Sequence, residues 1–349
     1  MKAVYLTGLK RLEVVEMAEP RLQRDDDVLL RVDVVGVCGS DVHTYLEGRI
    51  GGAKVTYPWI LGHECAATVL ATGPAAGGLK AGQRVAVDPL IPCNRCDQCL
   101  AGRKHTCRNQ KFLASPGGAP GALVERLVMP AECCYPIPDS VTAVQAALAE
   151  PLSIGLHARN LAALRGGTAA ILGSGPIGLC VLLALKEAGA TRVFMTDLID
   201  SRLELARRLG AERTHRGDRG DVLAAAEKAV PLGMDAVFEC AGKQETIDQG
   251  VAMLAPGGTL VLVGIPAEDR ISLDIHVARR RELAIQNVRR QNLCLAPALE
   301  LVAKGKICVD PLATHHFDLD EAPRAFQTVA EYRDGVVKAM IHVTKQKLH

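Results

Sequence analysis

The chain has 349 residues, of which 48% are hydrophobic and 3% aromatic, and its 41 basic residues nearly balance its 39 acidic ones. This length predicts about two domains with aliphatic cores, and the balanced charge argues against a nucleic-acid partner, which needs a clustered positive face. No apolar run reaches the roughly 18 residues of a membrane span without interruption, so no membrane partner is expected. Twelve cysteines and a charged, strand-like N-terminus without a signal peptide favour a reducing, cytoplasmic location.

The first 150 residues or so combine short β patterns with many turn residues. Residues 28–34 and 68–72 are rich in β-branched and aliphatic residues, which predicts strands, and glycines separate such segments. The pattern predicts an irregular, loop-rich β domain. A short helix is expected to begin near Cys38 and Asp41, after the strand that ends near Val35.

Potential zinc ligands stand in a stretch that reads GVCGSDVH at residues 36–43 and GHE at residues 62–64. Cys38, His63 and Glu64 offer a thiolate, an imidazole and a carboxylate, which is the ligand set of a catalytic zinc with one open position. Ser40 and His43 are close in sequence and are candidate proton carriers; the alternative for His43 is a helix-surface histidine.

Four further cysteines are spaced C-x2-C-x2-C-x7-C between polar neighbours. Thiolates at this spacing suit a closed tetrahedral zinc site, whereas the alternative is a chance cluster of core cysteines. Since four protein ligands leave no position for a substrate, we expect a structural zinc that stabilises a loop without a core of its own. The ligands are Cys93, Cys96, Cys99 and Cys107.

An acidic residue interrupts the apolar segment at residues 146–152, which predicts a helix that Pro151 bends or restarts. Glu150 precedes this proline. It is either a solvated helix residue or, as we expect in so apolar a segment, a carboxylate directed at a charge.

Strands and helices alternate between residues 153 and 287, which predicts a parallel sheet. Residues 168–172 form a buried strand that leads into GSGPIG at residues 173–178 and then into an apolar helix. A glycine motif in this context, with an acidic residue at the end of the next strand, is the fingerprint of a dinucleotide-binding fold. An α/β turn without a ligand is the alternative. The candidate coenzyme-binding residues are Gly173, Gly175, Pro176, Ile177, Gly178, Asp197 and Arg202.

The acidic residue of this motif favours NAD over NADP. Asp197 can accept hydrogen bonds from both ribose hydroxyls and would repel a 2′-phosphate. Arg202 leaves an alternative open, because an arginine here can serve a 2′-phosphate or pair with Asp197 or Glu204.

The pattern becomes mixed again after residue 288. Residues 295–303 and 321–331 predict helices and residues 336–343 a closing strand. The most economical arrangement returns this tail to the first domain. We therefore expect a catalytic domain of residues 1–152 plus 288–349 and an inserted dinucleotide-binding domain of residues 153–287, with an edge strand at 259–264 that can form a subunit interface.

The joint pattern resembles the zinc-dependent medium-chain dehydrogenases, over essentially the whole chain. The resemblance rests on GVCGSDVH, GHE, the four-cysteine motif, AEPLSIGLHA at residues 149–158, GSGPIG and the late KAMI at residues 338–341. The sorbitol, or polyol, branch is the most similar one. The resemblance implies an α/β fold, with a GroES-like β catalytic domain and an inserted Rossmann domain with a doubly wound parallel sheet.

The resemblance also implies ligands and a reaction. The catalytic zinc would be held by Cys38, His63 and either Glu64 or Glu150, two carboxylates that can exchange during turnover in such enzymes. A second zinc would be structural, and NAD would accept hydride from a secondary alcohol of a polyol such as sorbitol, xylitol or galactitol. The protein would be a homodimer or homotetramer.

Four residues fall at positions that line the polyol pocket in the family: Tyr45, Phe112, Glu150 and Arg289. Tyr45 and Phe112 can instead be core aromatics, and Arg289 a surface charge. Ser40 would be the first proton carrier and His43 the exit.

Other functions stay open at this point. Within the same fold, the chain can be an alcohol, threonine or sugar dehydrogenase. A non-catalytic nucleotide-binding protein would lack catalytic ligands, and a zinc-ribbon nucleic-acid binder would need a basic surface.

Overall fold

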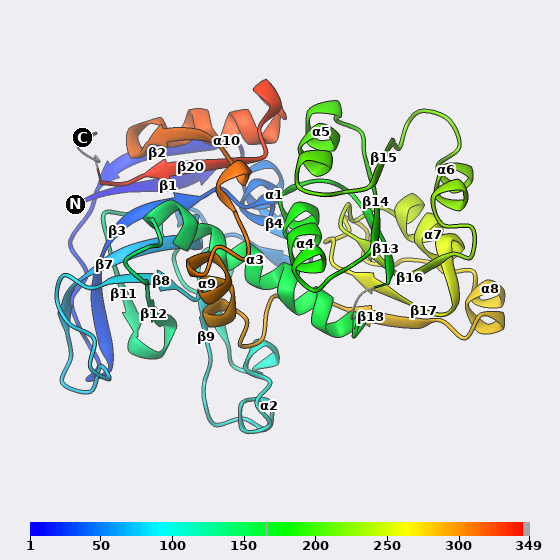
Figure 1. Cartoon of the computed structure of the whole chain (residues 1–349). Coiled ribbons are helices and arrows are strands. Elements are labelled where there is room, and N and C mark those ends of the chain that lie inside the picture. Colours follow the sequence, from blue (N-terminus) through cyan, green and yellow to red (C-terminus); the bar gives the residue numbers. More distant parts are fainter. Residues whose placement is uncertain (165–166, 345–349) are drawn as a thin grey trace. The chain divides into compact units, whose positions relative to one another are not determined.

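The computed structural model describes residues 1–164 and 167–344. The chain falls into two compact units, one made of Met1–Glu150 and Leu295–His349 and the other of Pro151–Cys294 (Figure 1). The C-terminal segment therefore packs with the N-terminal unit.

The first unit is built around a mixed sheet. Its order is β12-β8-β7-β3-β20-β19, and β11 also pairs with β3. A smaller sheet joins β2, β1 and β6, so the predicted N-terminal strand pair is confirmed. The strands of this unit are β1 (Lys2–Gly8), β2 (Arg11–Glu16), β3 (Asp27–Gly36), β4 (Arg49–Ile50), β5 (Ala53–Lys54), β6 (Trp59–Ile60), β7 (Glu64–Thr72), β8 (Arg84–Val87), β9 (Leu90–Ile91), β10 (Lys111–Phe112), β11 (Arg126–Pro130), β12 (Cys134–Pro136), β19 (Ala313–Asp318) and β20 (Lys338–His342).

Short helices connect these strands. The expected helix after β3 is confirmed: α1 begins directly after Cys38 and ends at Glu47. Gly48 caps it, and its φ of 66° is the left-handed conformation that glycine tolerates. The helices of the unit are α1 (Gly39–Glu47), α2 (Asp97–Leu100), α9 (Leu295–Ala303) and α10 (Ala322–Ala330), with 3-10 turns η1 (Lys104–Thr106), η2 (Ala131–Cys133), η3 (Asp310–Leu312), η4 (Leu319–Glu321) and η5 (Arg333–Gly335). A further helix, α3 (Ala143–Ala162), begins in this unit and ends in the second, because the division between Glu150 and Pro151 falls within it.

The helix around Pro151 is longer than predicted. α3 continues through the proline to Ala162, so Pro151 does not restart it. A single missing N–H is tolerated because the helix is 20 residues long and most of its side chains around this position are buried.

The second unit has a parallel sheet, as predicted. Its order is β15-β14-β13-β16-β17-β18, and all of its strand pairs are parallel. The helices α4, α5, α6, α7 and α8 connect the strands (Figure 1). The elements are β13 (Thr168–Leu172), α4 (Pro176–Glu187), β14 (Arg192–Asp197), α5 (Asp200–Arg208), β15 (Arg213–Arg216), α6 (Val222–Ala229), β16 (Met234–Glu239), α7 (Gln244–Met253), β17 (Leu254–Leu262), α8 (Ile275–Arg280) and β18 (Ala284–Asn287).

The prediction that residues 259–264 form an edge strand is wrong. These residues belong largely to β17, which lies inside the sheet, and β18 forms the edge. The sequence conceals β18 because all four of its residues are exposed, so it lacks the apolar pattern that marks a strand.

Within residues 1–164 and 167–344, none of the helices is both long enough and apolar enough to cross a membrane.

Candidate active site and zinc-binding lobe

The three predicted catalytic ligands meet because two strands are in register. Cys38 follows β3, and His63 and Glu64 stand at the start of β7, where Gly36 and Glu64 are direct partners in the antiparallel ladder. One ligand atom each from Cys38, His63 and Glu64 lies within 4.8 Å of the other two. His63 and Glu64 are buried and Cys38 is half-buried, so this thiolate, imidazole and carboxylate form a compact site for a metal ion.

Only one of the two carboxylate oxygens of Glu64 has a hydrogen-bond partner among the described residues. Its Oε1 accepts a hydrogen bond of 2.7 Å from Nζ of Lys338, and both side chains are only 1% exposed. Its Oε2 has no hydrogen-bond partner among the described residues. A Cβ at Gly36 would clash with this oxygen, so glycine leaves room for the carboxylate. A buried carboxylate oxygen without a donor fits a cation at this point.

His63 is oriented by Asp41. Its Nδ1 lies 3.2 Å from Oδ2 of Asp41, which is buried in the first turn of α1. Nε2 is therefore the nitrogen left for a metal, and the carboxylate behind the imidazole is the usual arrangement at zinc sites. Burial alone would lower the pKa of His63, but the charges of Asp41 and Cys38 outweigh it and raise this pKa well above 6.5. The surroundings of His63 thus favour a positive charge.

Glu150 lies close to the same cluster. It is 4% exposed, and burial raises its pKa to about 8, opposed by His63 and supported by the charges of Glu64 and Asp88. Its neighbours show that the carboxyl group is buried among charged groups, so it is not a solvated helix residue.

The two candidate proton carriers have different neighbours. The hydroxyl of Ser40 donates to Sγ of Cys38 over 3.3 Å, at the edge of the cluster. His43 lies one helical turn further along, with Nδ1 3.7 Å from Oε1 of Glu47 and a side chain 44% exposed. Ser40 thus faces the ligands, and His43 has access to water.

The residues expected to line a substrate pocket differ in their environment. Phe112 in β10 lies beside His63, with ring centroids 5.3 Å apart. Tyr45 is 7% exposed and packs in the core against Phe326, with centroids 5.5 Å apart. Arg289 is exposed and belongs to the second unit.

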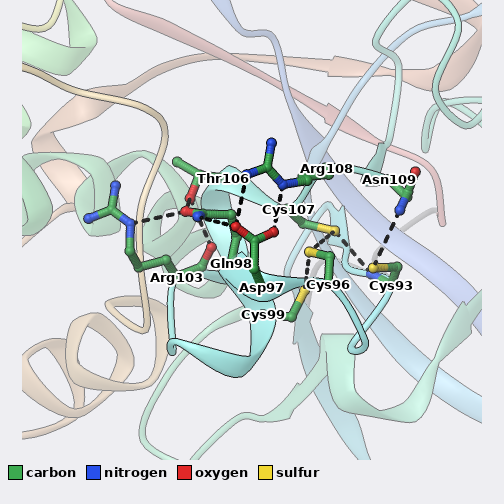
Figure 2. A network of polar contacts seen from close by, with 10 residues as sticks. All are labelled: Cys93, Cys96, Asp97, Gln98, Cys99, Arg103, Thr106, Cys107, Arg108 and Asn109. Carbon is green, nitrogen blue, oxygen red and sulfur yellow. Dashed lines mark hydrogen bonds and ion pairs between the residues drawn. The ribbon is translucent and has the colours of Figure 1, made fainter.

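The four cysteines of the second motif converge in the lobe around α2 (Figure 2). Their sulfur atoms lie within 4.8 Å of one another, with Cys96 at 3.6 Å from Cys99 and at 3.8 Å from Cys107. A hydrogen bond from the backbone of Arg95 is the main cause that lowers the pKa of Cys93 to about 6. Donors of this kind stabilise thiolates, which are the form that binds zinc.

Few apolar groups hold this lobe together. Polar pairs surround the sulfur atoms, including Arg108 with Asp97 at 2.6 and 2.8 Å and Thr106 with Gln98 at 2.8 Å (Figure 2). These pairs are largely exposed and contribute little by themselves. A bound metal would therefore be the main stabilising element of the lobe.

Replacing Cys96 by serine is expected to lower the apparent Tm by about 5 °C or more, because a closed zinc site couples metal binding to folding. Thermal unfolding and zinc analysis measure the effect, and the zinc content should fall from about two per chain to about one. Cys308→Ser, at an exposed cysteine, is the control. An unchanged Tm in Cys96→Ser would overturn the structural role.

The glycine motif lies between β13 and α4 as predicted. Gly173 has a φ of 105°, and a Cβ at Gly178 would clash with the carbonyl of Gly173. Both positions therefore require glycine, for the turn and for the close approach of helix and strand. The loop ends at the N-terminus of α4, where backbone amides can bind phosphate.

Asp197 does more than the sequence predicts. Its Oδ2 accepts from the backbone N–H of Ser174 at 2.7 Å and its Oδ1 from that of Ile199 at 2.9 Å. It thus ties the glycine loop to the end of β14, and each oxygen keeps a lone pair for a ribose hydroxyl. Arg202 points toward the loop, because a Cβ at Gly175 would lie 3.7 Å from its Nη1.

The sequence motifs alone do not reveal the roles of two residues of the site, Asp41 and Lys338. Asp41 was expected only to begin a helix, and Lys338 was noted only as part of the KAMI segment. A signal exists for each: Asp41 comes three residues after a metal ligand in the first turn of a helix, and Lys338 is a lone charge in an apolar closing strand.

The fold and the two ligand clusters define a zinc-binding dehydrogenase with a Rossmann unit. Two family models match: "Alcohol dehydrogenase GroES-like domain" over residues 24–139 and "Zinc-binding dehydrogenase" over residues 176–304. Sorbitol dehydrogenase of Gallus gallus is 38% identical, with 97% of this chain and 94% of that protein covered. L-idonate 5-dehydrogenase of Vitis vinifera is 36% identical, with 98% and 94% covered. A solved structure of a candidate zinc-binding dehydrogenase from Sinorhizobium meliloti, bound to NADP, has a TM-score of 0.90 at 33% identity, with 98% and 99% covered.

The chain therefore belongs to the zinc-dependent medium-chain dehydrogenases, as its motifs predict. It is an oxidoreductase that acts on CH–OH groups with zinc and a nicotinamide coenzyme. The predicted combination of a GroES-like domain and a Rossmann domain is confirmed.

Proposed function

We propose that the enzyme oxidises a secondary alcohol of a polyol, such as sorbitol, xylitol or galactitol, with NAD. The observation that carries this proposal is the convergence of ligand atoms from Cys38, His63 and Glu64 within 4.8 Å, together with the buried Oε2 of Glu64, which has no hydrogen-bond partner among the described residues. The relatives that act on sorbitol and L-idonate support a polyhydroxylated substrate.

The residues that would hold the catalytic zinc are Cys38, His63 and Glu64, with Glu150 as the alternative carboxylate. A bound zinc supplies a Lewis acid that makes the alcohol proton more acidic, and NAD accepts the hydride. Cys93, Cys96, Cys99 and Cys107 would hold the structural zinc. We assign the catalytic role to residues 1–152 plus 288–349 and the coenzyme-binding role to residues 153–287.

Side chains of the protein would then transfer the proton of the substrate hydroxyl to water. Ser40 would accept the proton of the substrate hydroxyl while giving up its own hydroxyl proton, and the more exposed His43 would release a proton to water. The contact of 3.3 Å between Ser40 and the Cys38 sulfur and the exposure of His43 support these roles. Asp41 keeps His63 in one orientation and Lys338 keeps one oxygen of Glu64 occupied, so the ligands are preorganised.

In the first unit, the substrate-binding residues would include Phe112, which packs against His63, together with Tyr45 and Glu150. Arg289 favours a hydroxyl-rich substrate. For the coenzyme, Gly173, Gly175, Pro176, Ile177 and Gly178 would bind the pyrophosphate beside Arg202, and Asp197 would accept the ribose hydroxyls and favour NAD.

A substrate panel tests the proposal. The zinc-loaded enzyme is assayed with NAD and with sorbitol, xylitol, galactitol, L-threonine, ethanol and 2,3-butanediol. We expect the highest kcat/KM with a polyol, and preference for threonine or a simple alcohol would reject the proposed substrate class.

We also propose that the protein is a cytoplasmic homodimer or homotetramer. One edge of β18 has no strand partner among residues 1–164 and 167–344, which supports an assembly, because its four residues are exposed and the exposed Ile265, Ile271 and Ile275 belong to the same unit. Light scattering of the purified protein measures the mass, and a monomer would contradict this proposal.

Asp41→Asn should weaken binding of the catalytic zinc by about 10–100-fold, because the ligand His63 loses its carboxylate partner. Competition with a chelator measures the affinity. Glu47→Gln, on the same helix but next to His43, should leave zinc affinity unchanged. Equal affinities for Asp41→Asn and the unmodified enzyme would show that Asp41 does not orient His63.

A further inference from the structure

Two strand ends in the second unit bring a cation next to the residue expected to bind the adenosine ribose. Asp197 ends β14 and Arg216 ends β15, and the two are direct partners in the parallel ladder. The backbone N–H of Gly217 donates to the carbonyl of Asp197 at 3.0 Å, so the loop after β15 stays beside Asp197. Arg216 is therefore well placed to meet a 2′-phosphate on that ribose.

Two carboxylates already hold this arginine. Nη1 of Arg216 lies 2.9 Å from Asp200, while Nε and Nη2 form a bidentate pair with Asp218 at 2.8 and 2.7 Å. The Arg216 side chain is only 20% exposed, although both acids are more open to water. The pair with Arg216 lowers the pKa of Asp218 to about 2. Bidentate contacts of this kind are the strongest form of arginine recognition.

Arg202, a second nearby arginine, extends toward a different part of the site. Nη1 of Arg202 lies near Gly175, at the glycine loop, which is where a pyrophosphate would bind. Arg216 is thus an arginine at the end of this strand that could pair with a 2′-phosphate, and its guanidinium is paired with two acids instead.

We propose that Asp200 and Asp218 determine coenzyme specificity by holding Arg216, so that the site accepts a 2′-hydroxyl and rejects a 2′-phosphate. A 2′-phosphate next to Asp197 would meet three carboxylates and would have to displace a bidentate ion pair to reach Arg216. A solved relative with a very similar fold binds NADP, so the fold itself does not exclude this coenzyme. The inference rests on the proposed coenzyme-binding role of this unit, and it extends specificity beyond Asp197.

Titration of NADH and NADPH, followed by their fluorescence, tests the proposal with the full-length, zinc-loaded chain and needs no alcohol substrate. In Asp200→Asn/Asp218→Asn, the ratio of NADPH to NADH affinity should rise about tenfold, equivalent to one ion pair with phosphate. Adding Arg216→Gln should remove this gain. Glu212→Gln/Asp221→Asn removes the same charge nearby without touching Arg216, and asparagine can still cap α6 at position 221. This control should keep the original ratio.

The experiment distinguishes failure of the specificity role from failure of the proposed function. An unchanged ratio in the double variant, or a gain that survives Arg216→Gln, overturns the specificity role while the proposed function stands. An equal gain in the control double variant would show that only net charge matters and also overturns it. If the unmodified chain binds neither dinucleotide, the coenzyme-binding role fails and the inference fails with it. Asp200→Asn alone, at a side chain 67% exposed, provides a second folded variant that should show part of the gain.

Discussion

Replacing Cys38 by serine is expected to lower kcat for alcohol oxidation by about 10³-fold or more. The metal supplies several kcal/mol of transition-state stabilisation, and each 1.36 kcal/mol is tenfold in rate. A serine hydroxyl is a poor zinc ligand at neutral pH, so the site should lose its metal. The fold should persist, because residue 38 is half-buried at the N-cap of α1, where serine is a favoured residue.

Zinc analysis and steady-state kinetics on the same preparation check this expectation. The zinc content should fall from about two per chain to about one, with thermal unfolding little changed. Cys308→Ser, at the exposed cysteine, should keep both zinc and activity. If Cys38→Ser retained two zincs and a kcat within tenfold of the unmodified enzyme, Cys38 would not be a ligand.

Lys338→Met is expected to lower the free energy of unfolding by about 3–5 kcal/mol. Removing one partner of a buried ion pair leaves an uncompensated charge, here on Glu64, and both side chains are only 1% exposed. Methionine keeps much of the length of the lysine stem, so lost packing contributes less. Denaturant unfolding of the metal-free protein measures the effect without the contribution of zinc.

A second substitution separates charge from packing. Glu64→Gln in the Lys338→Met background should recover part of the lost stability, because the buried group is then neutral. Lys2→Met is a matched control: Lys2 pairs with Asp320 at 2.8 Å, but the pair is exposed and its removal should leave stability nearly unchanged. Equal effects of Lys338→Met and Lys2→Met would show that burial of the pair is unimportant.

Lys338 also connects the end of the chain to the site. Its Nζ donates both to Glu64 and to the carbonyl of Val37, so β20 provides a cation beside the carboxylate ligand at the start of β7. The register explains this position, because Met340 and Gly36 are partners where β20 meets β3. The pairing of the last strand with β3 thus brings the cation to the carboxylate.

The sequence by itself was sufficient for features whose chemistry is local. The four-cysteine lobe spans residues 93–107, and GSGPIG follows a strand and opens a helix, so spacing alone predicts how these residues come together. The GHE segment likewise carries two candidate ligands on consecutive residues. Short-range geometry leaves few alternatives for such motifs.

Only the tertiary structure decided which distant groups complete the site. Asp41 meets His63 and Lys338 meets Glu64 because a helix and two strands place them together, and neither contact follows from sequence spacing. The edge strand β18 and the acids around Arg216 are further examples, since exposed residues and surface charges leave no periodic signal. Burial and strand register, which depend on the whole chain, determine how the charged groups of this enzyme are paired.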